Sequence, residues 1–247
     1  MNDLLTSTGT RPAPDRALLV VAHPDDIDFG AAGTVAALTE AGTDVAYCLV
    51  TSGDAGSDHL PIDRDELMTL REREQTAAAA AVGVPADRIT FLRHPAGLVE
   101  PTAELRRDIS AVIRRERPDV VITQSPERNY QRIYASHPDH LAAGEATLRA
   151  VYPDARNPRA FPELMAAGLE PHGVREVWLM ALAEPDLIVD VTSTFPRKVA
   201  ALRAHDSQTS RMEDLEGLLR GWGTAIATAG AMDAGRLAEG FKVVNTG

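Results

Sequence analysis

Histidine and aspartate side chains gather in two short segments that are far apart in the chain. The first segment contains His23, Asp25 and Asp26, and the second, with the sequence His-Pro-Asp-His, contains His137, Asp139 and His140. Two imidazoles and one carboxylate are the ligand set of open zinc sites, in which water takes the remaining position and the metal lowers the pKa of that water to about 7. A second carboxylate could serve as the base. The two segments together therefore predict a metal centre that activates water.

A structural interpretation is also open for each segment. Pro24 and Asp25 are residue types that commonly begin a helix. Ser136 and Pro138 could begin another helix ahead of an Ala-rich run at 141–150. The doubled His-Pro-Asp pattern favours the metal site, and the same residues can cap helices as well.

The elements that must bring the two segments together alternate in type. Residues 17–22 are continuously apolar, which is typical of a strand buried on both faces. The following runs predict strands at 44–51, 89–92 and 120–123, and helices at 31–41, 64–82 and 103–115. This alternation predicts an α/β fold, Rossmann-like, with a mostly parallel sheet and helices on both faces.

The later part of the chain has a less regular pattern. It predicts strands at 176–181 and 187–191, a helix at about 196–204, and a more helical tail. Residues 150–174 are rich in proline and predict an irregular excursion. We expect its residues 152–171 to form a rim over the substrate site.

The strand ends indicate where a ligand binds. In open parallel sheets, ligands bind beyond the carboxyl ends of the strands, where the loops diverge. Three segments fall there, at 23–26, 51–56 and 124–140. The two groups of histidine and aspartate residues are thus expected at one edge of the sheet.

Composition and charge exclude several classes of protein. With 25 Lys+Arg against 36 Asp+Glu, the net charge of −11 is spread along the chain and argues against a nucleic-acid partner. The single cysteine, Cys48, allows neither an internal disulfide nor a Cys-rich zinc site. The sequence contains no run of about 18 apolar residues that would predict membrane insertion, and no signal peptide is recognisable. We therefore expect a cytoplasmic protein.

The chain is expected to form a single domain. No Gly/Ser-rich linker, composition break or internal repeat divides it. We therefore predict a flexible N-terminal tail at 1–14 and one domain at 15–247. The sequence leaves a homo-oligomer open.

Several motifs resemble one enzyme family. Residues 22–26, Ala-His-Pro-Asp-Asp, followed by Gly30 and Gly33, resemble the signature of the PIG-L/LmbE-like N-acetylglucosaminyl deacetylases. That family includes the deacetylase of mycothiol biosynthesis and the mycothiol conjugate amidase. Further blocks resemble the family in the same order, at 51–56, 71–83, 117–119, 137–140, 198–208 and 239–241.

The resemblance implies a role for each site residue. The zinc ligands would be His23, Asp26 and His140, with Fe²⁺ as an alternative metal. Asp25 would be the general base acting on the metal-bound water. His137 would stabilise the oxyanion or protonate the leaving amine, and Asp139 would orient it. Substrate contacts are expected from Arg71, Asp54 and Tyr134.

The implied function is that of a zinc-dependent hydrolase. It would remove an N-acetyl or related acyl group from a small GlcNAc-type amino sugar or its conjugate. The chain departs from the family at Ala96, where the family often has Asp, and at Asp54, where Glu is more usual. Tyr134 is offset by one residue from the family's catalytic Tyr. These departures concern substrate contacts more than the metal.

Three other functions are possible alternatives to a deacetylase. An amidase of a thiol or other small-molecule conjugate would use the same centre. A ferrous oxygenase also uses two histidines and one carboxylate as metal ligands, but Asp25 would have no role in that chemistry. A non-catalytic Rossmann-type binding module would need Gly-x-Gly-x-x-Gly after the first strand, where this chain has His-Pro-Asp-Asp.

Overall fold

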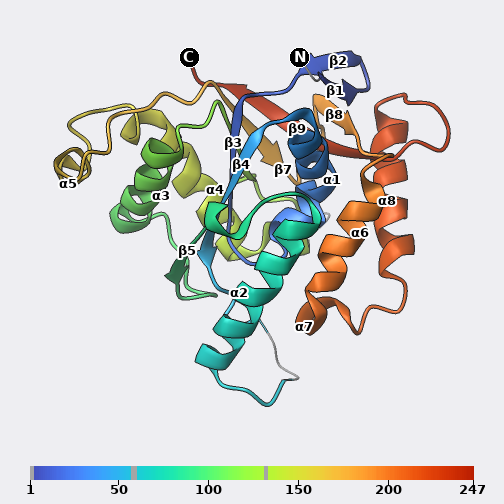
Figure 1. The fold of residues 1–247 in the computed structure, drawn as a ribbon, viewed down its shortest axis with the longest axis horizontal. Coiled ribbons are helices and arrows are strands. Elements are labelled where there is room, and N and C mark those ends of the chain that lie inside the picture. The colour runs from blue at the N-terminus through green and yellow to red at the C-terminus, as the bar shows by residue number, and fades with distance from the viewer. Residues whose placement is uncertain (1–2, 57–59, 131–132) are drawn as a thin grey trace.

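The computed structural model describes residues 3–56, 60–130 and 133–247. A nine-stranded sheet with the order β2-β1-β8-β9-β7-β6-β3-β4-β5 runs through the molecule, with helices on both faces (Figure 1). The strands are β1 Asp3–Thr6, β2 Gly9–Pro12, β3 Arg16–Val21, β4 Asp44–Thr51, β5 Ile89–His94, β6 Val120–Gln124, β7 Glu176–Met180, β8 Leu187–Asp190 and β9 Ala238–Asn245.

The α-helices connect and cover these strands. They are α1 Asp26–Ala41, α2 Arg64–Ala81, α3 Ala103–Glu116, α4 Pro138–Arg149, α5 Pro162–Ala166, α6 Phe195–Ala204, α7 Asp206–Thr209 and α8 Leu215–Ala229. Short 3₁₀ turns lie at Ala86–Arg88 (η1) and Ile133–Ser136 (η2), and Ala150–Asp154 (η3) continues α4. No helix within the described part of the chain is both long and apolar enough to cross a membrane.

The strands β7, β6, β3, β4 and β5 are mutually parallel, as the alternating pattern predicts. Ala17 of β3 lies opposite Val45 of β4 on one side and Val120 of β6 on the other. Successive residues of β3 point to opposite faces, so Leu18 packs with α3 and α4 while Leu19 packs with α1 and α2. The central strands are therefore buried on both faces, and their carboxyl ends share one edge of the sheet.

The remaining strands make the sheet mixed. β9 is antiparallel to both β7 and β8, whereas the sequence indicated a more helical tail. Its residue Phe241 is fully buried and packs 5.8 Å from the ring of Trp178, centroid to centroid. The α/β class is confirmed. Because β9 lies between β7 and β8, it pairs with backbone N–H and C=O groups at the edges of both strands, which a helix in its place would leave without partners.

The N-terminal segment differs from the flexible tail expected at 1–14. Its residues 3–12 form the antiparallel hairpin β1–β2, which extends the sheet beyond β8. Leu4 is 1% exposed, and Arg11 forms an ion pair with Glu176 and lies 5.3 Å over the ring of Trp178. Burial of Leu4 and these contacts hold the segment in place.

Close approaches of helices to strands set the position of α4. A Cβ atom added to Gly144 would lie 2.2 Å from the backbone oxygen of Gln124 at the end of β6. Only glycine permits that distance, so α4 packs directly on the strand end. This contact places the first turn of α4, which carries His140, at the carboxyl edge of the sheet.

The proline-rich segment lies far from that edge, contrary to the rim expected at 152–171. His172 bonds through Nε2 to the carbonyl oxygen of Pro118, at the amino end of β6, with a distance of 2.8 Å. The buried guanidinium of Arg114 on α3 donates to backbone oxygens of this segment, at Asp154, Ala155, Asn157, Ala160 and Leu169. Helix α5 accordingly projects at the side of the molecule (Figure 1).

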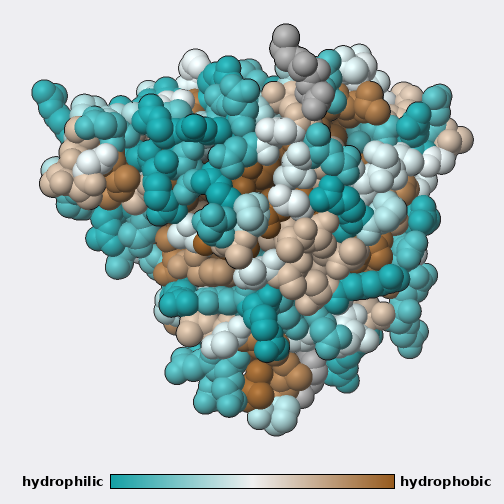
Figure 2. All heavy atoms as spheres, in the orientation of Figure 1, coloured by the Kyte–Doolittle hydropathy of each residue, from teal (hydrophilic) through white to brown (hydrophobic). Residues whose placement is uncertain are grey.

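The surface of the molecule is largely polar. Hydrophilic side chains cover most of the face seen in Figure 2, and apolar side chains there form only small, separated patches. Most buried apolar residues gather in two large clusters, one on each face of the sheet, and a small third cluster joins β8, α8 and β9. Burial of these clusters is the main driving force for folding.

Candidate metal and catalytic site

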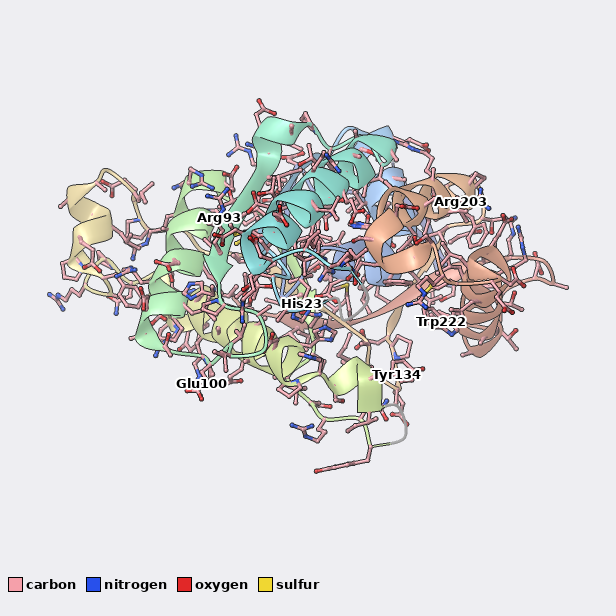
Figure 3. All side chains as sticks on the ribbon, turned by 90° about the horizontal axis from the view of Figure 1, so that it is seen from below. His23, Arg93, Glu100, Tyr134, Arg203 and Trp222 are labelled. Atoms are coloured by element: carbon pink, nitrogen blue, oxygen red, sulfur yellow. The ribbon has the colours of Figure 1, made fainter. Side chains whose placement is uncertain are left out.

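The two predicted segments meet at the carboxyl edge of the sheet. His23 directly follows the strand end of β3, and His140 lies in the first turn of α4. The Nδ1 atom of His23 is 3.3 Å from Nε2 of His140. His23 lies near the middle of the molecule seen from below, with Glu100 and Tyr134 to either side of it (Figure 3).

Asp26 completes a compact group of ligand atoms. Its Oδ1 is 3.0 Å from Nε2 of His140, and its Oδ2 is 3.4 Å from Nδ1 of His23. Atoms bound tetrahedrally to zinc at about 2.0–2.1 Å lie about 3.3 Å from one another. The spacing of His23, Asp26 and His140 thus fits a metal ion, and this is the ligand set that the resemblance implies.

His137 lies at the open side of the group. Nitrogen atoms of His23, His137 and His140 come within 4.8 Å of one another, so His137 borders the same centre. Its Nδ1 accepts a hydrogen bond of 3.1 Å from the backbone N–H of Asp139. In a neutral ring the proton therefore sits on Nε2, which makes that atom a donor.

The carboxylate of Asp139 contacts His23, whereas it was expected to orient His137. Its Oδ2 is 2.9 Å from Nε2 of His23, and its oxygens accept hydrogen bonds from the backbone of Gly97 (2.6 Å) and Val99 (3.2 Å). A carboxylate in this position fixes the tautomer and ring orientation of a metal-binding histidine. Nδ1 of His23 is thereby left free of a proton when a metal binds.

The charges of the group are strongly coupled in the metal-free protein. Burial lowers the pKa of His23, but hydrogen bonds to Asp139 and Asp26 outweigh it and raise this pKa to about 10. Burial raises the pKa of Asp26, but the charge and hydrogen bond of His140 hold it well below its usual range. A proton on His23 thus occupies the position that a metal ion would take.

His137 has the opposite tendency. Its pKa is lowered by burial and by the positive charges of His23 and His140. A neutral imidazole is thus favoured at the open side of the centre.

Asp25 lies beside the ligand group at the start of α1. Its backbone is in the left-handed region, with φ 89°, and its carboxylate accepts a hydrogen bond of 3.0 Å from Arg71. Burial raises the pKa of Asp25 to about 6, against the opposing charge of Arg71. A carboxylate with a pKa near neutrality is suited to accept and return a proton.

Arg71 lies behind Asp25 and is only 3% exposed. Besides Asp25, its guanidinium donates to the carbonyl oxygens of Pro24 (2.6 Å) and Gly53 (3.2 Å). A Cβ atom at Gly53 or Gly56 would lie 2.2 or 2.4 Å from Nη1, so both glycines make room for it. The substrate contact expected of Arg71 stays a prediction, and in the structure the side chain holds Asp25.

The other two expected substrate contacts lie nearer the rim. Asp54 accepts a hydrogen bond of 3.0 Å from the backbone of Ala96 and forms an ion pair with Arg64. Burial raises the pKa of Asp54, but these two partners lower it more. Tyr134 lies in η2 and is 63% exposed. Their contacts with substrate stay predictions.

A buried group beneath Asp25 was not identified from the sequence. Gln75 on α2 accepts a hydrogen bond from the backbone of Asp25 and donates one to Asp28 on α1, which His205 also contacts. His205 is one of the residues that resemble the family in the 198–208 block. Gln75 lies inside the 71–83 block without being one of its matching residues, and Asp28 lies in none of the blocks. The one sequence signal for Gln75 is helical spacing, since it follows Arg71 by about one helical turn.

Fold and site together define an α/β enzyme with a histidine and carboxylate centre suited to a metal ion. Residues 18–151 match the family described as PIG-L: GlcNAc-PI de-N-acetylase. The chain belongs to this family. As a deacetylase relative it is an enzyme that hydrolyses amides, which sets aside the non-catalytic binding module.

Similar proteins carry related names. The chain is 34% identical over 230 residues to a diacetylchitobiose deacetylase of Thermococcus kodakarensis, covering 93% of this chain and 83% of that protein. It is 31% identical to a 1D-myo-inositol 2-acetamido-2-deoxy-alpha-D-glucopyranoside deacetylase of Kineococcus radiotolerans, covering 80% and 70%. The structure of the N,N'-diacetylchitobiose deacetylase from Pyrococcus horikoshii superposes with a TM-score of 0.85 at 28% identity, covering 94% and 84%.

Proposed function

We propose that the protein is a zinc-dependent N-deacetylase of a GlcNAc-type amino sugar or its conjugate. The observation that carries the proposal is the convergence of His23, Asp26 and His140, with ligand atoms 3.0–3.4 Å apart, beside the carboxylate of Asp25. We expect the substrate to be a small molecule and not a nucleic acid, and we expect the protein to act in the cytoplasm.

The ligand group suits zinc because it combines two imidazoles with one carboxylate. When bound, the metal supplies a Lewis acid for the amide carbonyl and lowers the pKa of a water molecule. Asp139 supports this role because its hydrogen bond to Nε2 of His23 turns Nδ1 toward His140 and Asp26. Fe²⁺ has similar ligand preferences and is the alternative.

Asp25 is proposed as the general base. With a pKa of about 6, its carboxylate is mostly ionised at neutral pH yet basic enough to take a proton. The hydrogen bond from Arg71 holds the carboxylate in one orientation. The proton accepted by Asp25 would then be available for the departing nitrogen.

His137 is proposed to act on the other side of the amide. Its Nδ1 is engaged by the backbone N–H of Asp139, so Nε2 is available to donate. A neutral donor at this position would stabilise the oxyanion that develops when the carbonyl is attacked. The leaving amine needs one proton, which is the proton that Asp25 takes from the water, passed on directly or through His137.

The names of the relatives support the substrate class. They describe proteins that act on diacetylchitobiose and on an inositol glycoside of 2-acetamido-2-deoxyglucose. Both compounds carry an acetamido group on carbon 2 of a glucose ring. We propose the same acetamido group as the reactive part of the substrate, with Asp54, Arg71 and Tyr134 around the sugar.

Metal content and acetate release, measured on the same samples, test the proposal. The wild-type protein, purified without oxygen, should hold about one zinc or iron per chain and release acetate from N-acetylglucosamine conjugates. His140→Ala should lose both metal and turnover, whereas Asp25→Asn should keep the metal and lose turnover by roughly a hundredfold or more. Acetate release by metal-free protein would contradict the proposed mechanism.

A further inference from the structure

Three fully buried polar side chains lie beneath the site and have no part in the proposed chemistry. They are Asp28 of α1, Gln75 of α2 and His205 between α6 and α7, each 0% exposed. Nε2 of His205 is 2.8 Å from Oδ2 of Asp28, and Nε2 of Gln75 donates to the same oxygen at 3.0 Å. Burial of polar groups is costly unless they are hydrogen-bonded. These two bonds satisfy Oδ2 of Asp28 and Nε2 of His205, while Oδ1 of Asp28 and Nδ1 of His205 have no partner among the described residues.

The three side chains connect to the site at one atom. Oε1 of Gln75 accepts a hydrogen bond of 3.0 Å from the backbone N–H of Asp25. Asp25 has φ 89°, a conformation that residues with a side chain seldom adopt unless the surroundings hold them in it. The contact from Gln75 is thus made where the backbone most needs support.

We propose that His205, Asp28 and Gln75 form a positioning relay that holds the backbone of Asp25 in this conformation and so aims its carboxylate at the metal centre. The inference rests on the proposed role of Asp25 as the base. None of the three touches the reacting atoms. They are positioning residues, and His205 acts through Asp28 and Gln75.

The direction of each hydrogen bond follows from the chemistry of the groups. The carboxylate of Asp28 only accepts, so the amide nitrogen of Gln75 must face it. The amide oxygen of Gln75 then faces Asp25, as the backbone N–H requires. If Asp28 moved, the Gln75 amide could turn its nitrogen toward the N–H of Asp25 and lose the bond. His205, donating from Nε2, holds Asp28 from the other side.

A neighbouring pair provides a matched control. Ser207 of α7 donates to Glu74 of α2 through both its backbone N–H (2.8 Å) and its hydroxyl (2.6 Å). This pair is buried and joins the same part of the chain to α2, but it has no hydrogen bond to Asp25. Ser207→Ala should therefore disturb the packing of α7 without disturbing Asp25.

Two substitutions at His205 separate the proposed role from simple packing. The amide nitrogen of glutamine can take the place of Nε2, whereas that of asparagine reaches only the place of Nδ1. His205→Gln should preserve the contact with Asp28, and His205→Asn should break it. Gln75→Met removes the acceptor of the Asp25 N–H at nearly unchanged volume.

The first measurement is amide hydrogen exchange at Asp25, which requires no activity. Exchange should be about tenfold or more faster in His205→Asn and Gln75→Met than in wild type, and nearly unchanged in His205→Gln and Ser207→Ala. Thermal unfolding of all four variants identifies any that are unfolded. Unchanged exchange at Asp25 in folded His205→Asn and Gln75→Met would overturn the relay.

The second measurement is steady-state kinetics with metal content. His205→Asn should lower kcat by about tenfold to a hundredfold, because a small misplacement of the base has a large effect, while KM and metal content stay close to wild type. His205→Gln should recover most of kcat. Equal kcat in His205→Asn and Ser207→Ala would contradict the relay, whereas absence of acetate release in wild type would contradict the proposed function and leave the exchange result standing.

Discussion

At the scale of the residue, the hydrogen bonds of Asp139 show which histidine its carboxylate orients. The sequence places Asp139 two residues after His137, and this proximity suggested that it orients His137. In the structure the Asp139 side chain turns away and bonds Nε2 of His23, while only its backbone reaches His137. Because His23 is a proposed ligand, we propose that Asp139 supports metal binding by orienting His23.

This assignment predicts the behaviour of Asp139→Asn. The variant should bind zinc about 10–100-fold more weakly, because the charged partner of His23 is lost. Competition with a chelator of known affinity measures the change. His137→Gln is the control and should keep zinc affinity within about threefold while lowering kcat. Normal zinc affinity in Asp139→Asn would return the carboxylate to the role first expected.

Metal affinity should depend on pH in a way set by His23. Its pKa in the metal-free protein is raised from 6.5 to about 10, so a metal ion must displace a proton from it. Between pH 7 and 9 the apparent affinity should rise about tenfold per pH unit, the slope for one displaced proton. An ordinary histidine would give almost no slope in this range. Zinc titrations at several pH values measure the slope, and a flat profile would contradict the raised pKa.

The same proton should affect stability when metal is absent. Since the folded protein binds it more tightly than the unfolded chain, its stabilising contribution is complete below pH 6.5 and is lost as pH rises toward about 10. Thermal unfolding of the metal-free protein should reveal this decline. His23→Gln should weaken it, and a decline of equal size in that variant would assign it to other groups.

At the scale of the element, helix α4 carries His140 and is placed by its contact with β6. Gly144→Ala would put a Cβ atom 2.2 Å from the backbone oxygen of Gln124 and force the helix outward. We expect a loss of about 1–3 kcal/mol in the free energy of unfolding, with reduced zinc content, because His140 moves with the helix. Denaturant unfolding and metal analysis measure the two effects.

The matched control is a glycine in another helix. A Cβ atom at Gly221 of α8 would meet nothing within 4 Å. Gly221→Ala should therefore stabilise the protein, by up to about 1 kcal/mol, and leave zinc content unchanged. Equal effects of the two substitutions would mean that the approach of α4 to β6 is not what places His140.

The elements with strong local sequence patterns were predicted from the sequence, and those that depend on tertiary contacts were not. The strand predicted at 44–51 coincides with β4, and the helix predicted at 64–82 differs from α2 by one residue, because both have strong local patterns. Local patterns do not specify partners across the sheet. Burial of Leu4 in the hairpin and the position of β9 between β7 and β8 depend on tertiary contacts.

The candidate site follows the same division. His23, Asp26 and His140 were predicted because residue type and strand ends sufficed to place them. Their meeting at 3.0–3.4 Å agrees with that expectation. The bond from Asp139 to His23 and the relay under Asp25 depend on side-chain directions, which spacing along the chain does not determine.

At the scale of the whole molecule, the sheet separates two edges with different roles. The carboxyl ends of β3, β4 and β6 carry the candidate site, and the amino end of β6 anchors the proline-rich segment through His172. Arg114 holds that segment with hydrogen bonds to five of its residues. We therefore expect this segment to stabilise the fold and to have no contact with the substrate.

This separation predicts an effect on stability alone for Arg114→Met. Several backbone carbonyls would lose their donor, and the free energy of unfolding should fall by about 2–4 kcal/mol. Because the site lies at the opposite edge, kcat and KM below the unfolding temperature should stay within about twofold of wild type. Denaturant unfolding and steady-state kinetics on one sample compare the two. A changed KM in the folded variant would revive the proline-rich segment as a substrate rim.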